Sequence, residues 1–199
     1  QKAKPVFEVV PLGVYGGIDE RNLSAYLVAP IGTKEYVCLD AGTVHSGIEK
    51  AIEKGIFSVP SSTVLRQYIK GYCISHAHLD HVSGLIINSP ADSTKTVYAI
   101  APAMKMMQNH YFNDQTWANF GDEGLGKPLK KYHFETLSFA KTIPISNTSM
   151  TVQAFPLSHV NPYESTAFLI KKDNNAILYL GDTGPDSVEK TTNLADLWK

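Results

Sequence analysis

The segment His76-Ala77-His78-Leu79-Asp80-His81 brings three imidazoles and one carboxylate together within six residues. Neutral imidazoles and a carboxylate direct lone pairs at one another when they converge, and a divalent cation can hold such groups together. Imidazole nitrogen combined with carboxylate oxygen suits zinc, manganese or iron better than calcium or magnesium. The alternative is a solvated polar loop in which the histidines lie together by coincidence.

The residues on either side predict where this motif lies. A short buried strand is expected over residues 71–74, and an apolar run typical of a helix follows the motif. The motif is therefore expected at the carboxyl end of a strand, where α/β sheets hold their ligands. In an extended segment His76 and His78 point the same way, whereas Asp80 and His81 fall at the helix start and can face a second point nearby. The pattern predicts one or two metal ions.

Two later strand ends carry further candidate ligands. His159 follows an apolar strand expected over residues 150–155, and Asp182 follows a strand expected over residues 176–180 in a Gly-rich turn. Each alone is more typical of an ordinary loop residue than of a ligand. Together with the first motif they fit one crevice, with all three at the same ends of successive strands.

The strands and helices expected around these residues alternate along the chain, and this alternation predicts a mixed sheet covered by helices. The other strands are expected over residues 7–12, 24–28, 35–39, 96–99 and 166–171, and the other helices over residues 48–55, 61–69 (capped by a serine) and 102–111. The methionines of the last helix are expected to fill the core, and residues 113–130 are expected to form a long loop. Cys38 and Cys73 are expected to be buried free thiols, with a disulfide as the alternative.

Composition narrows the function classes. A formal net charge of −1 over 199 residues provides no basic surface for a nucleic-acid polymer. No apolar run approaches the length of a bilayer span, so no membrane association is expected. The chain begins with Gln1 and not with Met, which favours a processed periplasmic or secreted protein over a cytoplasmic one.

The order of these motifs resembles that of the metallo-β-lactamase fold superfamily. Residues 76–90 match, position by position, the signature of class II 3',5'-cyclic nucleotide phosphodiesterases. Supporting matches lie at residues 12–17, 22–24, 39–42, 113–120, 165–170 and 181–184. The resemblance therefore covers essentially the whole chain, and the fifteen-residue signature is more specific than the superfamily motif.

The resemblance implies an α/β (α+β) fold, an αββα sandwich, with residues 1–199 in a single domain. It implies two divalent metal ions, expected to be zinc, with manganese or iron as alternatives. One ion would be held by His76, His78 and His159, the other by Asp80 and His81, and Asp182 would bridge them. Asp40 resembles the superfamily's first aspartate and is expected to accept a hydrogen bond from a ligand or from the metal-binding loop; a plain turn aspartate is the alternative.

The resemblance also implies a seventh ligand, a histidine after Asp182. No histidine follows Asp182 up to Lys199, since His45, His110 and His133 all precede it. We therefore expect a chain truncated at its C-terminus, without much of the second half of the sandwich, with an incomplete second metal site and an uncertain activity of its own. We expect the apolar surface left uncovered to be buried by self-association of the chain or by the missing segment.

The implied activity is the opening of cyclic AMP or cyclic GMP to a 5'-nucleotide. Two adjacent metal ions lower the pKa of a shared water, so a bridging hydroxide is the expected nucleophile, oriented by Asp80 or Asp182. Trp117, Asn113 and Asn119 of the long loop, with Phe120, are expected to hold the purine by stacking and amide hydrogen bonds. The alternatives are another hydrolase of this fold (a lactonase, thioesterase, β-lactamase or nuclease) and a non-catalytic metal-binding fragment.

Overall fold

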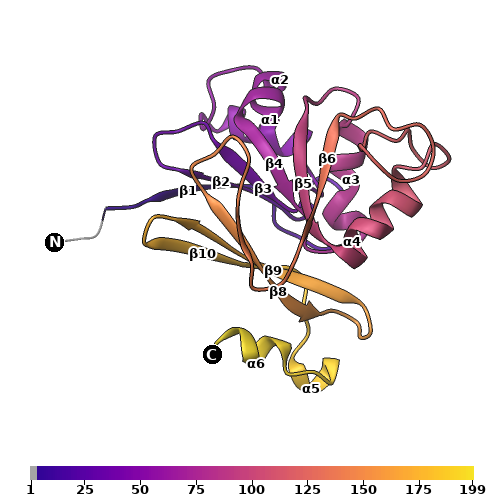
Figure 1. Cartoon of the computed structure of the whole chain (residues 1–199). Coiled ribbons are helices and arrows are strands. Elements are labelled where there is room, and N and C mark those ends of the chain that lie inside the picture. Colours follow the sequence, from indigo (N-terminus) through magenta and orange to yellow (C-terminus); the bar gives the residue numbers. More distant parts are fainter. Residues whose placement is uncertain (1–3) are drawn as a thin grey trace.

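The computed structural model describes residues 4–199 and contains two β-sheets stacked on each other (Figure 1). The first sheet has the order β1-β2-β3-β4-β5-β6. Its strands are β1 (Phe7–Gly13), β2 (Ala25–Pro30), β3 (Tyr36–Leu39), β4 (Ile69–Cys73), β5 (Lys95–Ile100) and β6 (Tyr132–Leu137). β1, β2 and β3 pair antiparallel, whereas β3 to β6 pair parallel. The expected mixed sheet is thus confirmed.

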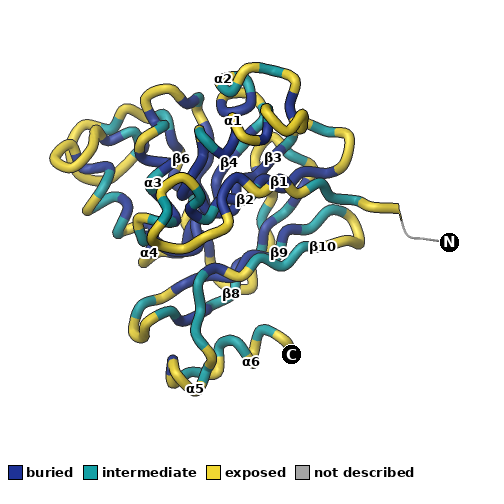
Figure 2. The backbone as a smooth tube through the Cα atoms, turned by 180° about the vertical axis from the view of Figure 1, so that it is seen from behind, coloured by how far each residue is buried: buried dark blue, intermediate teal, exposed yellow. Residues whose placement is uncertain are grey.

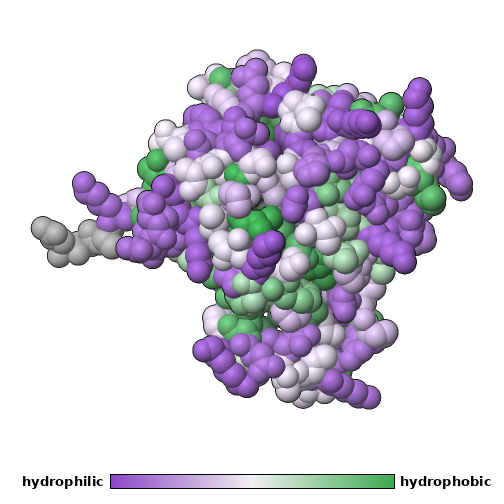
Figure 3. All heavy atoms as spheres, viewed as in Figure 1, coloured by the Kyte–Doolittle hydropathy of each residue, from purple (hydrophilic) through white to green (hydrophobic). Residues whose placement is uncertain are grey.

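The second sheet is antiparallel and has the order β10-β9-β8-β7. Its strands are β7 (Thr142–Pro144), β8 (Thr151–Ser158), β9 (Glu164–Lys172) and β10 (Asn175–Leu180). Alternate residues such as Phe168 and Ile170 are fully buried and join the core shared with the first sheet. In the space-filling view, hydrophobic residues gather over β8 and β9 (Figure 3).

The helices follow the strands of the first sheet and the end of β10. They are α1 (His45–Glu53), α2 (Ser61–Thr63) with a π-helical extension (Val64–Tyr68), α3 (Leu79–Asn88), α4 (Ala101–Met106) with a π-helical extension (Met107–Tyr111), α5 (Asp186–Glu189) and α6 (Asn193–Leu197). Figure 2 shows buried residues along the strands of the first sheet, whereas α5 and α6 are mainly exposed or half-buried. Within residues 4–199, no helix has both the length and the apolar character that crossing a bilayer requires.

Several expectations are confirmed by these elements. All the expected strands are present, Met104 and Met107 are buried in the core, and residues 113–130 contain no helix and no named strand. Both cysteines are buried free thiols. The sequence patterns therefore identified the parts of the chain that pack against the core.

Other expectations were wrong. No serine caps the second helix, because Pro60 occupies the N-cap position and no side chain bonds the first turn. β6 and β7 were not expected at all, since charged and polar residues interrupt the apolar pattern of β6 and β7 is only three residues long. The candidate ligands do not follow successive strands of one sheet, because β4 lies in the first sheet whereas β8 and β10 lie in the second.

Helix α3 lies directly against the turn that follows β3. The backbone N–H of Ala41 donates to the carbonyl of His81, and the N–H of Leu85 donates to the carbonyl of Ala41, at 2.8 and 3.1 Å. A Cβ atom on Gly84 would lie 2.6 Å from the carbonyl oxygen of Gly42, a contact with backbone that cannot move aside cheaply. The glycine therefore lets the helix that begins at the histidine motif approach this turn.

Replacement of Gly84 by alanine is expected to lower the free energy of unfolding by about 1–3 kcal/mol, because the added methyl group overpacks a closed contact. Urea denaturation monitored by circular dichroism measures the change. In open space the better helix propensity of alanine would instead raise the stability by about 1 kcal/mol. A G84A protein at least as stable as the wild type would contradict the close approach.

Candidate metal centre

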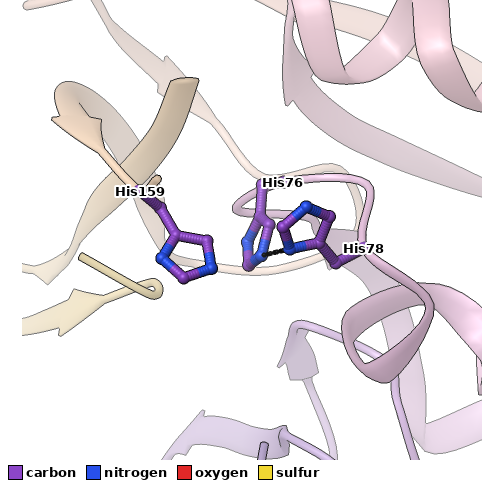
Figure 4. Close-up of side chains that lie close together, drawn as sticks. All are labelled: His76, His78 and His159. Carbon is purple, nitrogen blue, oxygen red and sulfur yellow. Dashed lines mark hydrogen bonds between the residues drawn. The ribbon is translucent and has the colours of Figure 1, made fainter. Parts of the chain in front are cut away.

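Three histidines from two sheets converge on one point. His76 and His78 lie on the segment between β4 and α3, and His159 directly follows β8. Figure 4 shows the three rings turned toward one another. His76 Nε2 and His78 Nδ1 are 3.1 Å apart, and the three residues offer nitrogen atoms that all lie within 4.8 Å of one another. Nitrogens on one tetrahedral zinc ion, each about 2.0–2.1 Å from the metal, are about 3.3 Å apart, so this spacing suits a shared ion.

A second group, made of His76, His81 and Asp182, lies beside the first and shares His76 with it. His81 Nε2 is 3.4 Å from Asp182 Oδ1 and 3.6 Å from Asp80 Oδ2. The other carboxylate oxygen of Asp182, Oδ2, is 3.8 Å from His159 Nε2. The two oxygens of Asp182 therefore face two different histidines.

The atom His81 Nε2 shows that these residues fit a metal ion. It is buried, and it has no hydrogen-bond partner within the described part of the chain. An unpaired polar atom is costly in a protein interior. A cation held between this nitrogen, Asp80 and Asp182 would satisfy the nitrogen and offset the charge of both carboxylates.

Asp40 lies under the centre and collects four hydrogen bonds. Asp40 is fully buried, and its φ of 52° lies in the left-handed region, which aspartate tolerates better than most residues do. Oδ1 accepts from the backbone N–H of Ser75 at 2.7 Å. Oδ2 accepts from the Ser75 hydroxyl, from His81 Nδ1 and from the Tyr179 hydroxyl at 2.8, 2.7 and 2.6 Å. The structure thus places Asp40 against both a candidate ligand and the loop that carries the histidine motif.

These bonds fix which ring nitrogens can bind a cation. The Ser75 hydroxyl gives its proton to Asp40, so its oxygen accepts from His76 Nδ1 at 2.9 Å. His81 Nδ1 likewise donates to Asp40. In both rings Nε2 is the nitrogen that points into the centre, and the partner on Nδ1 orients the ring.

Burial and neighbouring charges set the protonation of the centre. Burial, helped by His81, lowers the pKa of His76 to about 4, and burial with His159 lowers the pKa of His78. Burial alone would lower the pKa of His81, but the nearby carboxylates of Asp182 and Asp40 raise it to about 10. The nearby His81 ring likewise lowers the pKa of Asp182 to about 2. His76 and His78 thus keep free lone pairs for a metal ion, whereas His81 would have to lose a proton to bind one.

Sequence reasoning missed several residues that shape the centre. The backbone N–H of Gly17 donates to Asp80 Oδ2 at 3.0 Å, and the ring of Tyr163 lies 4.4 Å from that of His78. Ser75 and Tyr179 both bond Asp40. Ser75 directly precedes the motif and Gly17 lies within the matching residues 12–17, whereas Tyr163 and Tyr179 come close only through folding.

The long loop holds the three residues expected to bind a purine. The amide of Asn113 bonds the backbone of residues 109, 115 and 116, and the fully buried amide of Asn119 bonds the backbone of residues 121, 123 and 125. Trp117 Nε1 donates to the Ser89 hydroxyl at 3.0 Å. These contacts fold the loop, and binding of a base by these residues stays a prediction.

Comparison with known proteins identifies relatives of this chain. A model of the family described as class-II cAMP phosphodiesterases matches residues 58–199. A probable 3',5'-cyclic-nucleotide phosphodiesterase of Yersinia pestis is 44% identical over 97% of this chain and 59% of its own length. A 3',5'-cyclic-nucleotide phosphodiesterase of Aliivibrio fischeri is 42% identical over 96% of this chain and 61% of its own length. The chain thus spans about three fifths of these curated relatives.

Solved structures show the same fold. The crystal structure of unliganded yeast PDE1 superposes with a TM-score of 0.84 at 21% identity, over 97% of this chain and 69% of that one. The metallo-β-lactamase fold protein YhfI of Bacillus subtilis superposes with a TM-score of 0.61 at 17% identity, over 92% of this chain and 66% of that one. The expected metallo-β-lactamase fold is confirmed.

Proposed function

The chain belongs to the class II cyclic AMP phosphodiesterase family. We propose that the protein hydrolyses 3',5'-cyclic nucleotides to 5'-nucleotides at a centre of two divalent cations. The observation that carries this proposal is the position of Asp182, whose two carboxylate oxygens face His81 and His159, 3.4 and 3.8 Å away. The names of the relatives in Yersinia pestis and Aliivibrio fischeri support the substrate class.

The proposed ligands divide into two sets around this aspartate. His76, His78 and His159 would hold one cation, Asp80 and His81 the other, and Asp182 both. When bound, a pair of such cations, with zinc favoured by the nitrogen-rich donors, supplies a water of lowered pKa as nucleophile and offsets the negative charge of the phosphodiester.

The chain's own groups prepare the site for this chemistry. Asp40 and Ser75 hold the Nδ1 protons of His81 and His76, so the rings keep their orientation without a substrate. Gly17 fixes one oxygen of Asp80 through its backbone N–H. A Cβ atom on Gly16 would lie 3.5 Å from Asp80 Oδ2 and 4.0 Å from Asp182 Oδ2, so the backbone of this loop runs beside both carboxylates. Groups fixed in advance stabilise developing charge without reorganisation.

Substrate hydrolysis by the metal-stripped and reloaded full-length protein tests the proposal. We expect hydrolysis of cyclic AMP or cyclic GMP, its loss after chelation, and its return with zinc or manganese. A model lactone and a model thioester are assayed in parallel, because other hydrolases share this fold. Turnover of only the lactone or thioester, or cyclic nucleotide hydrolysis that survives complete metal removal, would contradict the proposal.

A further inference from the structure

The candidate ligands of the metal centre come from two different sheets. His76, His78, Asp80 and His81 follow β4 of the first sheet, whereas His159 and Asp182 follow β8 and β10 of the second. The distance between His81 and Asp182 therefore depends on how the two sheets are held relative to each other at this end. A metal centre tolerates little error in such a distance, because ligand spacing sets affinity.

Tyr179 joins the sheets at that point. It lies on β10, three residues before Asp182, and its hydroxyl donates to Asp40 Oδ2 at 2.6 Å. Asp40 in turn accepts from His81 Nδ1 through the same oxygen at 2.7 Å. The other bonds of the Asp40 carboxylate come from His81 and Ser75, on the first sheet's side of the centre, so among the described contacts Tyr179 is the one donor from the second sheet.

The single proton of the Tyr179 hydroxyl decides which group donates in each of its two hydrogen bonds. The Tyr179 hydroxyl has one proton, which it gives to Asp40, so its oxygen accepts from Ser24 Oγ at 3.1 Å. Burial, with the nearby Asp40, raises the pKa of Tyr179 well above its usual range, so the phenol stays a donor. The chain of bonds runs from Ser24 through Tyr179 and Asp40 to His81.

The surrounding packing leaves little freedom at this junction. A Cβ atom on Gly181 would lie 2.5 Å from Cβ of Ser75, so the end of β10 already touches the residue before His76. The ring of Tyr179 lies 5.8 Å from that of Tyr26 on β2 of the first sheet. The ring contacts would persist without the hydroxyl, whereas the bond to Asp40 would not.

We propose that Tyr179 is a positioning residue of the metal centre, which ties β10 to Asp40 and thereby sets the placement of His81 relative to Asp182. This inference rests on the proposed metal-dependent function. Among the described hydrogen bonds, the Tyr179 hydroxyl bonds Ser24 and Asp40 and no candidate ligand, so it acts through Asp40. Its hydroxyl is thus expected to matter for the cation at His81 and little for the cation at His76, His78 and His159.

Titration of cobalt(II) into the metal-free full-length protein, followed by visible absorption, tests the proposal. The binding step that depends on His81 is the one lost in H81N. Loss of a direct outer partner of a ligand weakens metal binding by about tenfold to a hundredfold. Because Tyr179 acts one bond further out, through Asp40, we expect this step to weaken about tenfold in Y179F, with the other step unchanged. Y26F is the matched control, because it removes a hydroxyl from the neighbouring ring.

Three results would overturn the inference. Y179F that binds cobalt like Y26F in both steps would show that the hydroxyl does not position His81. Equal weakening of both steps would show a general loss of structure and no positioning role. A wild-type protein that binds no cobalt would overturn the proposed function together with this inference, so the two failures are distinguishable.

Discussion

Replacement of Asp182 by asparagine is expected to lower the rate of cyclic AMP hydrolysis by about a hundredfold to a thousandfold. The cations of such sites contribute several kcal/mol of transition-state stabilisation, and each ~1.4 kcal/mol changes the rate about tenfold. The substitution keeps the shape of the side chain but removes its charge and one of its two acceptor oxygens. Because one oxygen faces His81 and the other His159, both proposed cations would be affected.

Initial rates and bound metal, measured on the same preparation, check this expectation. Asp173→Asn is the matched control, because Asp173 lies in the exposed turn between β9 and β10 of the same sheet as Asp182. We expect D173N to keep wild-type activity and metal content. A D182N protein that retains more than about a tenth of the wild-type rate would contradict the bridging position of this carboxylate, since several kcal/mol of stabilisation predict a larger loss.

Replacement of Asp40 by alanine is expected to lower the free energy of unfolding of the metal-free protein by about 3–5 kcal/mol, the usual effect of removing one partner from a buried charged network. The fully buried carboxylate accepts four hydrogen bonds. Its loss would leave His81 Nδ1, the Tyr179 hydroxyl and the groups of Ser75 without their acceptor. Buried donors that lose their acceptor are costly because water cannot replace it.

Backbone strain must be separated from this effect, and Asp173 again provides the control. Asp40 and Asp173 both have a φ of 52°, but only Asp40 is buried. D173A therefore measures what alanine costs in a left-handed conformation, and the difference between D40A and D173A isolates the network. Urea denaturation of the three proteins gives both values. A difference below about 1 kcal/mol, the range of one ordinary hydrogen bond, would contradict the assignment of Asp40 as the support of the centre.

The local patterns of the sequence predicted the parts of the site that depend on neighbouring residues. The motif from His76 to His81 lies where an apolar strand meets an apolar helix, and the structure begins α3 at Leu79, within that motif. His159 and Asp182 were found because each follows an apolar strand. The resemblance to class II phosphodiesterases was carried by residues 76–90, and the family match confirmed it.

The sequence patterns did not predict features that depend on contacts between residues far apart in the chain. β6 is a strand because it pairs with β5, although polar residues interrupt its apolar pattern. The amides of Asn113 and Asn119 bond the backbone of their own region, contacts that the sequence did not predict, and their contact with a substrate stays a prediction. Neither outcome can be seen from a short window of residues, because the partners are chosen by the completed fold.

The sequence by itself determined the family of this chain and the types and order of its candidate metal ligands, because residues carry their donor atoms wherever they are placed. Only the tertiary structure decided that these candidate donors come from two sheets. It also decided that the hydroxyl of Tyr179 on the second sheet bonds Asp40 beside the first sheet, 139 positions away in the chain. Sequence spacing says nothing about such a contact, since its geometry arises when two separately formed sheets pack face to face.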